Sequence, residues 1–219
     1  MRPTAMRFGL CATLAAALTA AGPGCDRAPS TRTAPDTSAR TVVLSALRAT
    51  QAKKARTEAT VNGMTAGGRT FESVVQTQLA PPDRSRSWMQ LPGGGSREII
   101  VIGDRAWSRP SKQATWTSVA DATRSVAPRI DERLRVGIER GVLNVEMVRT
   151  ADLDGRATTE YAVTGTVPGS DTGPSEARVW IRGDGLVQRC SVETHGTATT
   201  RIDETWTYDD SISIESPER

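Results

Sequence analysis

The sequence predicts an α+β domain, in which an antiparallel sheet of about nine or ten strands packs with two or more helices. Two observations lead to this class. Apolar and polar residues alternate in short runs that are separated by turn sequences such as Asn62-Gly63 and Asp154-Gly155, and two further segments show helical spacing instead. Because the strands do not alternate with helices along the chain, a parallel doubly wound sheet is excluded.

Two amphipathic helices are expected. The first covers Thr41–Lys54, where Val43 and Leu47 recur at helical spacing. The second covers Pro128–Arg140, because proline suits the first turn of a helix, an apolar stripe follows it, and Gly141 is placed to end it. Each apolar stripe is expected to pack on the sheet.

The remaining regular segments are predicted strands. In chain order they are Thr57–Val61, Phe71–Leu79, Arg86–Gln90, Ile99–Ile102, Leu143–Thr150, Arg156–Thr164, Ala177–Arg182, Leu186–Thr194 and Thr197–Tyr208. Short turns join most of them, so consecutive strands are expected to pair as an antiparallel meander that the second helix interrupts.

The amino terminus has the features of an export signal. Arg2 and Arg7 precede an uncharged apolar run, Phe8–Ala21, of about fourteen residues. As a helix this run would be roughly 21 Å long, whereas the hydrocarbon core of a bilayer is about 30 Å thick. A cleaved signal peptide therefore fits better than a permanent transmembrane helix.

The run ends in Ala21-Gly22-Pro23-Gly24-Cys25, which resembles the lipobox of bacterial lipoproteins. The resemblance implies that Cys25 receives a diacylglycerol and becomes the first mature residue. The family prefers leucine three residues before the cysteine, where this chain has Gly22. An ordinary secretory signal that is cleaved nearby is the alternative.

Three parts of the chain are therefore expected. Residues 1–24 form a signal peptide, residues 25–39 comprise the lipidated cysteine and a flexible polar tether, and residues 40–217 form a single domain.

Three segments of this domain resemble the LolA-like superfamily of bacterial periplasmic lipoprotein carriers and lipid-binding lipoproteins, which includes the LppX and LprG type. They are Ile100–Trp107 (a strand, a tight turn and an aromatic residue), Trp180–Arg189 (two strands around a turn) and Trp206–Pro217 (a closing strand with an Ile-x-x-Pro ending). The resemblance implies a strongly curved half-barrel sheet, helices on its concave side, and an apolar cavity between them.

Large apolar side chains on the predicted strands are the candidates for lining such a cavity. The chain has five tryptophans but only two phenylalanines and two tyrosines. The candidates are Trp88, Ile100, Ile102, Trp107, Trp116, Val179, Trp180, Ile181, Ile202 and Trp206. The alternative is a packed core in which the same side chains only fill space.

These observations predict a monomeric, membrane-anchored lipoprotein of the bacterial envelope that faces the periplasm. We expect it to bind a lipid, an acyl chain or a lipoprotein without catalysis, by burial of apolar surface. An envelope sensor or protein-interaction module with the same fold and no ligand cavity is the alternative. The residues do not indicate which membrane holds the protein.

Composition argues against other classes of function. The formal net charge of +3 falls to +1 when Arg2 and Arg7 leave with the signal peptide, so a nucleic-acid partner is not expected. The chain has one histidine, His195, and three cysteines whose spacing matches no metal or redox motif. No catalytic residue, metal or cofactor is therefore predicted.

Overall fold

The computed structural model describes residues 37–64, 67–91, 94–119, 129–167, 175–195 and 199–217. They belong to one compact unit, Thr33–Arg219. The predicted signal peptide, Cys25 and Pro128 lie outside the described residues, as does most of the predicted tether. None of the helices in these ranges combines the length and apolar character that crossing a bilayer requires.

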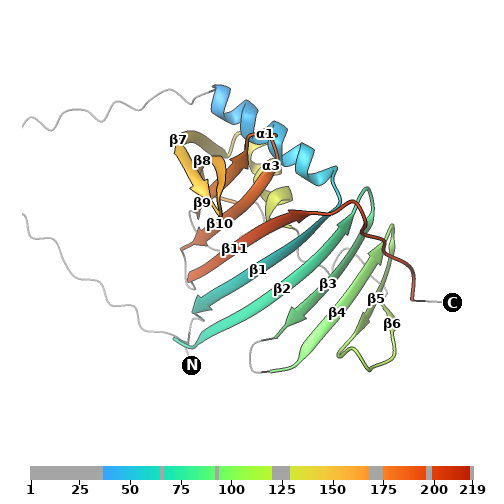
Figure 1. The fold of residues 1–219 in the computed structure, drawn as a ribbon. Coiled ribbons are helices and arrows are strands. Elements are labelled where there is room, and N and C mark those ends of the chain that lie inside the picture. The colour runs from blue at the N-terminus through green and yellow to red at the C-terminus, as the bar shows by residue number, and fades with distance from the viewer. Residues whose placement is uncertain are drawn as a thin grey trace, which may run out of the picture. The chain divides into compact units, whose positions relative to one another are not determined.

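The described residues form eleven strands in one open, curved antiparallel sheet (Figure 1). The strands are β1 (Ala55–Met64), β2 (Thr70–Ala80), β3 (Arg84–Gln90), β4 (Ser96–Ile102), β5 (Arg105–Arg109), β6 (Thr117–Val119), β7 (Leu143–Leu153), β8 (Arg156–Gly165), β9 (Ser175–Arg182), β10 (Val187–Thr194) and β11 (Thr199–Tyr208). The predicted α+β half-barrel is confirmed. The two strands beyond the nine listed from the sequence are β5 and β6, which have five and three residues and so carry too little alternation to detect.

The strand order is β6-β5-β4-β3-β2-β1-β11-β10-β9-β8-β7. The predicted meander is therefore two meanders, β1–β6 and β7–β11, which are joined because the first strand pairs with the last. The short strand β6 and the long strand β7 form the two edges of the sheet.

Two helices of the described part pack on one face of the sheet, which we call the helix-side face. Helix α1 (Thr37–Gln51) begins four residues before the predicted start and ends three residues before the predicted end. Helix α3 (Ile130–Glu139) lies within the predicted range. Helix α1 makes its main sheet contacts with β7, β9 and β10, and α3 makes its main sheet contacts with β7, while strands β3–β6 extend away from both helices (Figure 1).

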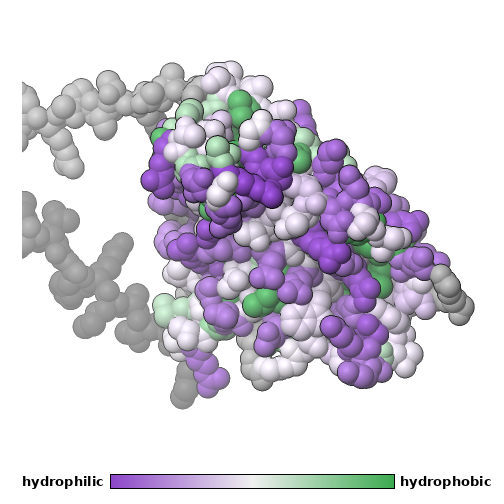
Figure 2. Space-filling view, in the orientation of Figure 1, coloured by the Kyte–Doolittle hydropathy of each residue, from purple (hydrophilic) through white to green (hydrophobic). Residues whose placement is uncertain are grey.

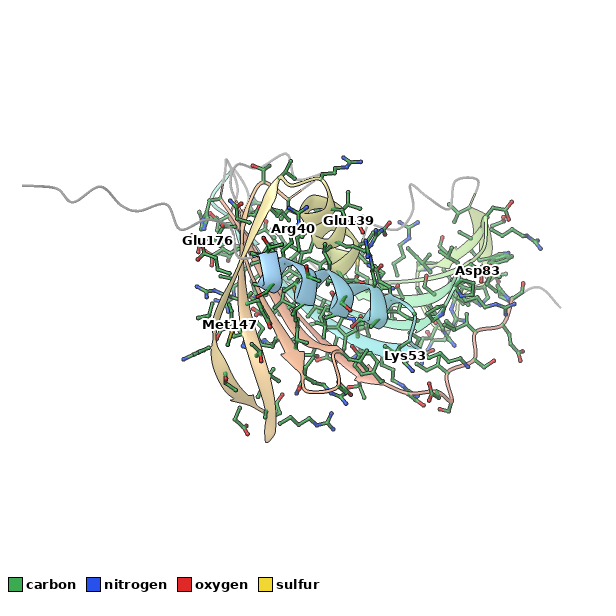
Figure 3. The ribbon with its side chains drawn as sticks, turned by 90° about the horizontal axis from the view of Figure 1, so that it is seen from above. Arg40, Lys53, Asp83, Glu139, Met147 and Glu176 are labelled. Atoms are coloured by element: carbon green, nitrogen blue, oxygen red, sulfur yellow. The ribbon has the colours of Figure 1, made fainter. Side chains whose placement is uncertain are left out.

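Polar contacts join the two helices. The Arg40 guanidinium of α1 donates to the carbonyl oxygens of Ile138 and Glu139 at 2.6 and 3.3 Å, and Figure 3 shows Arg40 beside Glu139. Arg48 also donates to the Glu139 carboxylate at 2.9 Å. A cation at a helix carboxyl end satisfies free carbonyl groups and opposes the helix dipole, so these contacts fix α1 on the end of α3.

A continuous apolar core lies between the helices and the sheet. Val43 and Leu47 of α1 and Leu134 and Ile138 of α3 are completely buried against strand residues such as Val179. Each such side chain stabilises the fold by roughly 1.5–3 kcal/mol relative to exposure. This part of the interior is filled by large side chains.

The segment after β11 packs on the opposite face of the sheet. Its Ile212 and Ile214 are buried with Ala80, Ile100 and Trp107. The segment is also held by polar contacts: Arg84 Nη1 donates to the Ile214 carbonyl at 2.8 Å, and Arg56 pairs with Asp209 at 3.0 Å. These contacts secure the carboxyl-terminal segment across strands of the first meander.

Leu134→Ala is expected to lower the free energy of unfolding by about 2–5 kcal/mol, because it opens a cavity in the filled core. Urea unfolding followed by circular dichroism measures the change. Leu91→Ala is the matched control, because Leu91 is 37% exposed and its loss should change stability by less than about 0.5 kcal/mol. Equal effects of the two substitutions would contradict the assignment of the core.

Candidate ligand-binding site

The ten candidate lining residues lie on two different faces of the sheet. Val179, Ile181 and Trp206 belong to the helix-side core, and Ile202 packs against it. Ile100 and Trp107 belong to the cluster on the opposite face, with Ile102 and Trp116 against it. The strand register also places Trp88 and Trp180 on the opposite face. The ten candidates therefore cannot all line one cavity, and which of them contact a ligand stays a prediction.

The physical reason is the two-residue period of a strand. Trp180 stands between Val179 and Ile181, so its side chain must point away from the core that receives theirs. On the opposite face the Arg189 guanidinium lies 5.3 Å from the centre of the Trp180 ring. The same two-residue period can be applied to the sequence, where it already assigns Trp180 to one face of the strand and Val179 and Ile181 to the other.

Trp206 is the one tryptophan of the described strands that enters the helix-side core. It is 4% exposed, and its indole N–H has no hydrogen-bond partner within the described residues. Cys190 is also completely buried there, and burial raises the pKa of its thiol well above the usual value. Beneath α1 and α3, these side chains form the packed core that was the alternative to a cavity.

On β1, β2 and β3 the helix-side face carries mostly small side chains, together with the larger Phe71, Leu79 and Met89. We call the small residues outside the filled core the β1–β3 floor: Thr57, Ala59, Ser73, Val75, Thr77, Ser85 and Ser87. The main contacts of α1 and α3 are with other strands. The β1–β3 floor is therefore the part of the helix-side face that lies outside the main contacts of α1 and α3, although its Thr57, Ala59 and Ser73 are buried.

The floor combines apolar and hydroxyl groups. The Thr77 and Ser87 hydroxyls lie 3.0 Å apart and hydrogen-bond to each other, and Ser73 donates to the Gln90 carbonyl. Paired hydroxyls need no solvent, so they can lie beneath an apolar ligand at little cost. The buried side chain of Ile99 follows Ser87 on the next strand and extends the apolar part of this face.

A buried acidic group lies beside the floor. Glu204 is 9% exposed, and the register places it between Ala59 and Cys190. Desolvation, together with the nearby Asp131 carboxylate, raises the pKa of Glu204 to about 7, although the Thr57 hydroxyl and Arg129 oppose the shift. At neutral pH this carboxyl group is therefore about half protonated and can donate a hydrogen bond.

The second acid comes from the first turn of α3. Asp131 is completely buried and accepts two hydrogen bonds from the Arg129 guanidinium, at 2.9 and 2.7 Å. Sequence analysis did not identify Glu204 or Asp131. Glu204 was detectable, because it lies two residues from both Ile202 and Trp206 and so must share their face. Within the described residues no group of acidic, histidine or cysteine side chains is arranged to hold a metal ion.

No known protein family and no curated protein sequence matches this chain. LprF and lipoprotein LppX are among the solved structures that share its fold. LprF from Mycobacterium bovis is 16% identical with a TM-score of 0.58, and the match covers 84% of this chain and 98% of that one. Lipoprotein LppX from Mycobacterium tuberculosis is 15% identical with a TM-score of 0.52, over 82% and 100% of the two chains. These similarities establish that the chain shares the fold of LprF and LppX, and LppX is one of the lipoproteins named in the predicted resemblance.

The raised pKa of Glu204 predicts that stability falls as the pH rises. The folded protein holds this proton up to about pH 7, whereas the unfolded chain releases it near pH 4.5, so the stabilisation is present below pH 4.5 and is lost through about pH 7. Across this window Glu204 should account for a loss on the order of 3 kcal/mol.

Urea unfolding between pH 4.5 and 8 measures this loss. Glu204→Gln should flatten the decline, while Glu132→Gln on the exposed side of α3 should leave it unchanged. Parallel pH profiles for the wild type and Glu204→Gln would contradict the prediction.

Proposed function

From the LolA-like fold, we propose that this chain is a lipid-anchored protein of the bacterial envelope whose domain binds a lipid or acyl chain without catalysis. The ligand lies on the β1–β3 floor, and Cys25 carries the membrane anchor. The observation that supports the proposal is the group of small side chains on the floor, which lies beside the filled core beneath α1 and α3.

Burial of apolar surface drives binding in this proposal. Each methylene group of an acyl chain that leaves water contributes about 0.8 kcal/mol. Ala59 and Val75 are paired on the floor and provide apolar surface across β1 and β2, next to Ala55 and Leu79 of the filled core. No bond to the ligand is made or broken, and the binding free energy comes from desolvation and contact.

The polar groups beside the floor would orient an amphipathic ligand. The Glu204 carboxyl and the Thr57 hydroxyl lie at the β11 side of the floor, beside Trp206 with its unpartnered indole N–H. A buried N–H without an acceptor costs free energy, and a ligand oxygen would remove that cost. The proposed orientation therefore places the polar end of the ligand toward β11.

The envelope location rests on the amino terminus and on the fold. The lipobox-like segment ends at Cys25, and LppX, whose structure is similar, is itself a lipoprotein. Two or more acyl chains on one cysteine would hold a protein stably on a membrane. We propose that the domain faces the periplasm from this anchor.

A protein-interaction module is the second candidate function, and the edge strand β7 favours it. Met147 and Val148 on this strand are 55% and 45% exposed, and the outer main-chain groups of an edge strand are free to pair with another strand. A partner strand would bind there whether or not the interior holds a ligand. The next experiment distinguishes the two functions, because only the first requires a lipid.

The full chain with Cys25→Ser, purified from a bacterial host, should contain a lipid that organic extraction and mass spectrometry detect. Ala59→Phe on this background should remove most of it, because the larger ring occupies the floor. Thr60→Phe, which points to the opposite face, is the matched control and should retain the lipid. Absence of lipid in the parent protein, or equal lipid in both variants, would contradict binding on the floor.

Cys25→Ser in the otherwise native chain should move the protein from the membrane fraction to the soluble fraction. It should also abolish incorporation of a labelled fatty acid, because the thiol that accepts the lipid is gone. Cys11→Ser is the control, since Cys11 is removed with the predicted signal peptide. Unchanged membrane association of the Cys25→Ser protein would rule out the lipid anchor.

A further inference from the structure

A second concave surface lies on the face of the sheet opposite α1 and α3. It is a groove of about 810 Å³ that crosses β11, β1, β2, β3 and β4. The strand register arranges most of its lining in two neighbouring rows, one containing Glu58, Gln76 and Trp88 and the other containing Arg56, Gln78 and Arg86. Five strands at a spacing of about 4.8 Å give the groove a length of roughly 19 Å.

The end of the groove at β4 is held rigid by a buried carboxylate. Glu98 is 3% exposed and accepts from Arg86 and Arg109, each with a closest distance of 2.6 Å. The Arg109 guanidinium lies 4.5 Å from the centre of the Trp116 ring and donates to the Lys112 carbonyl at 2.6 Å. This network fixes the Arg86 guanidinium and the backbone of Lys112 before any ligand arrives.

Other polar groups of the groove are available to a ligand. Within the described residues, the side chains of Gln78, Lys112 and Thr207 have no hydrogen-bond or ion-pair partner. The Trp88 ring is half-buried and lies between Gln76 and Glu98 in its row. The groove thus presents one aromatic surface among free donors and acceptors.

The charge of the groove favours an uncharged ligand. Arg56 is paired with Asp209, and Arg86 and Arg109 share Glu98. Glu58 accepts from Gln76 at 3.0 Å. Lys112 adds one positive charge without an ion-pair partner among the described residues, so the groove is close to neutral and has little to attract a polyanion or a polycation.

The lining also argues against two other classes of ligand. Trp88 is the one large apolar side chain in the groove, so an acyl chain would find little surface to contact. The face of β1–β4 turned to the viewer in Figure 2 is mostly hydrophilic or neutral. A peptide could not extend the sheet here, because the main chains of β11, β1, β2 and β3 are paired on both sides.

We infer that this groove binds a neutral oligosaccharide, with one sugar ring stacked on Trp88. A sugar ring has an apolar face that suits an indole and a rim of hydroxyl groups that both donate and accept hydrogen bonds. Gln76, Gln78 and the fixed Arg86 guanidinium meet those hydroxyls, and the length of the groove accommodates several linked rings. The groove lies on the other face of the sheet from the proposed lipid-binding floor, and of the floor residues only Thr57 and Thr77 also border it.

Isothermal titration calorimetry of the full chain with Cys25→Ser tests the inference. The probes are N-acetylchitohexaose, cellohexaose, maltohexaose and mannohexaose, each added up to millimolar concentration. At least one should bind, and Trp88→Ala should weaken its binding about tenfold or more. Trp88→Phe, which keeps an aromatic face, should recover part of the loss.

Trp180→Ala is the matched control, because Trp180 is also half-buried on this face but lies outside the groove. The Trp180→Ala variant should bind the sugar with the same affinity as the parent protein. Circular dichroism should show that every variant is folded. Failure of all four hexasaccharides to bind would overturn the inference, as would binding that Trp88→Ala leaves unchanged. Displacement of a bound sugar by an acyl chain, or its loss in Ala59→Phe, would place the sugar on the floor and also overturn it.

Discussion

Pairing of β1 with β11 is the constraint on which the rest of the structure depends. The two strands run antiparallel over their whole lengths, from Ala55 opposite Tyr208 to Met64 opposite Thr199. This contact joins two meanders that are far apart in the chain into one sheet. Its register also decides which side chains meet: Thr57 faces the same interior as Trp206 and Glu204, while Arg56 reaches Asp209 on the carboxyl-terminal segment.

Because one sheet carries both meanders, its two faces acquire different chemistry. The helix-side face holds the apolar core and the small residues of the floor. The opposite face is crossed by ion pairs between neighbouring strands, such as Arg149 with Glu160 at 2.8 Å and Arg189 with Asp203 at 3.0 Å. Each of these partly solvated pairs contributes little to the stability of the fold. Together they keep this face polar, so a second apolar layer cannot pack over most of its area. The two proposed sites follow from this division.

Local patterns predicted the elements well and their partners less well. Helical spacing located both described helices, and alternation located the long strands to within a few residues. The short strands β5 and β6 were missed because they are defined by hydrogen bonds to β4 and to each other rather than by their own composition. The candidate lining residues fall on both faces of the sheet for a different reason. They were chosen for apolar character alone, without regard to the face on which each side chain lies, although Trp180 and Ile181 cannot face the same side of a strand.

The sequence by itself determined the class of fold, the positions of the elements and the export features around Cys25, because these depend on periodicity and on contiguous residues. Only the tertiary structure decided where the interior is filled and where it is lined by small residues. It also decided that Glu204 and Asp131 share a buried site and that Trp88 lies in a polar groove. Those properties depend on which distant strands become neighbours, and the β1–β11 pairing that sets this is a contact between residues about 150 positions apart.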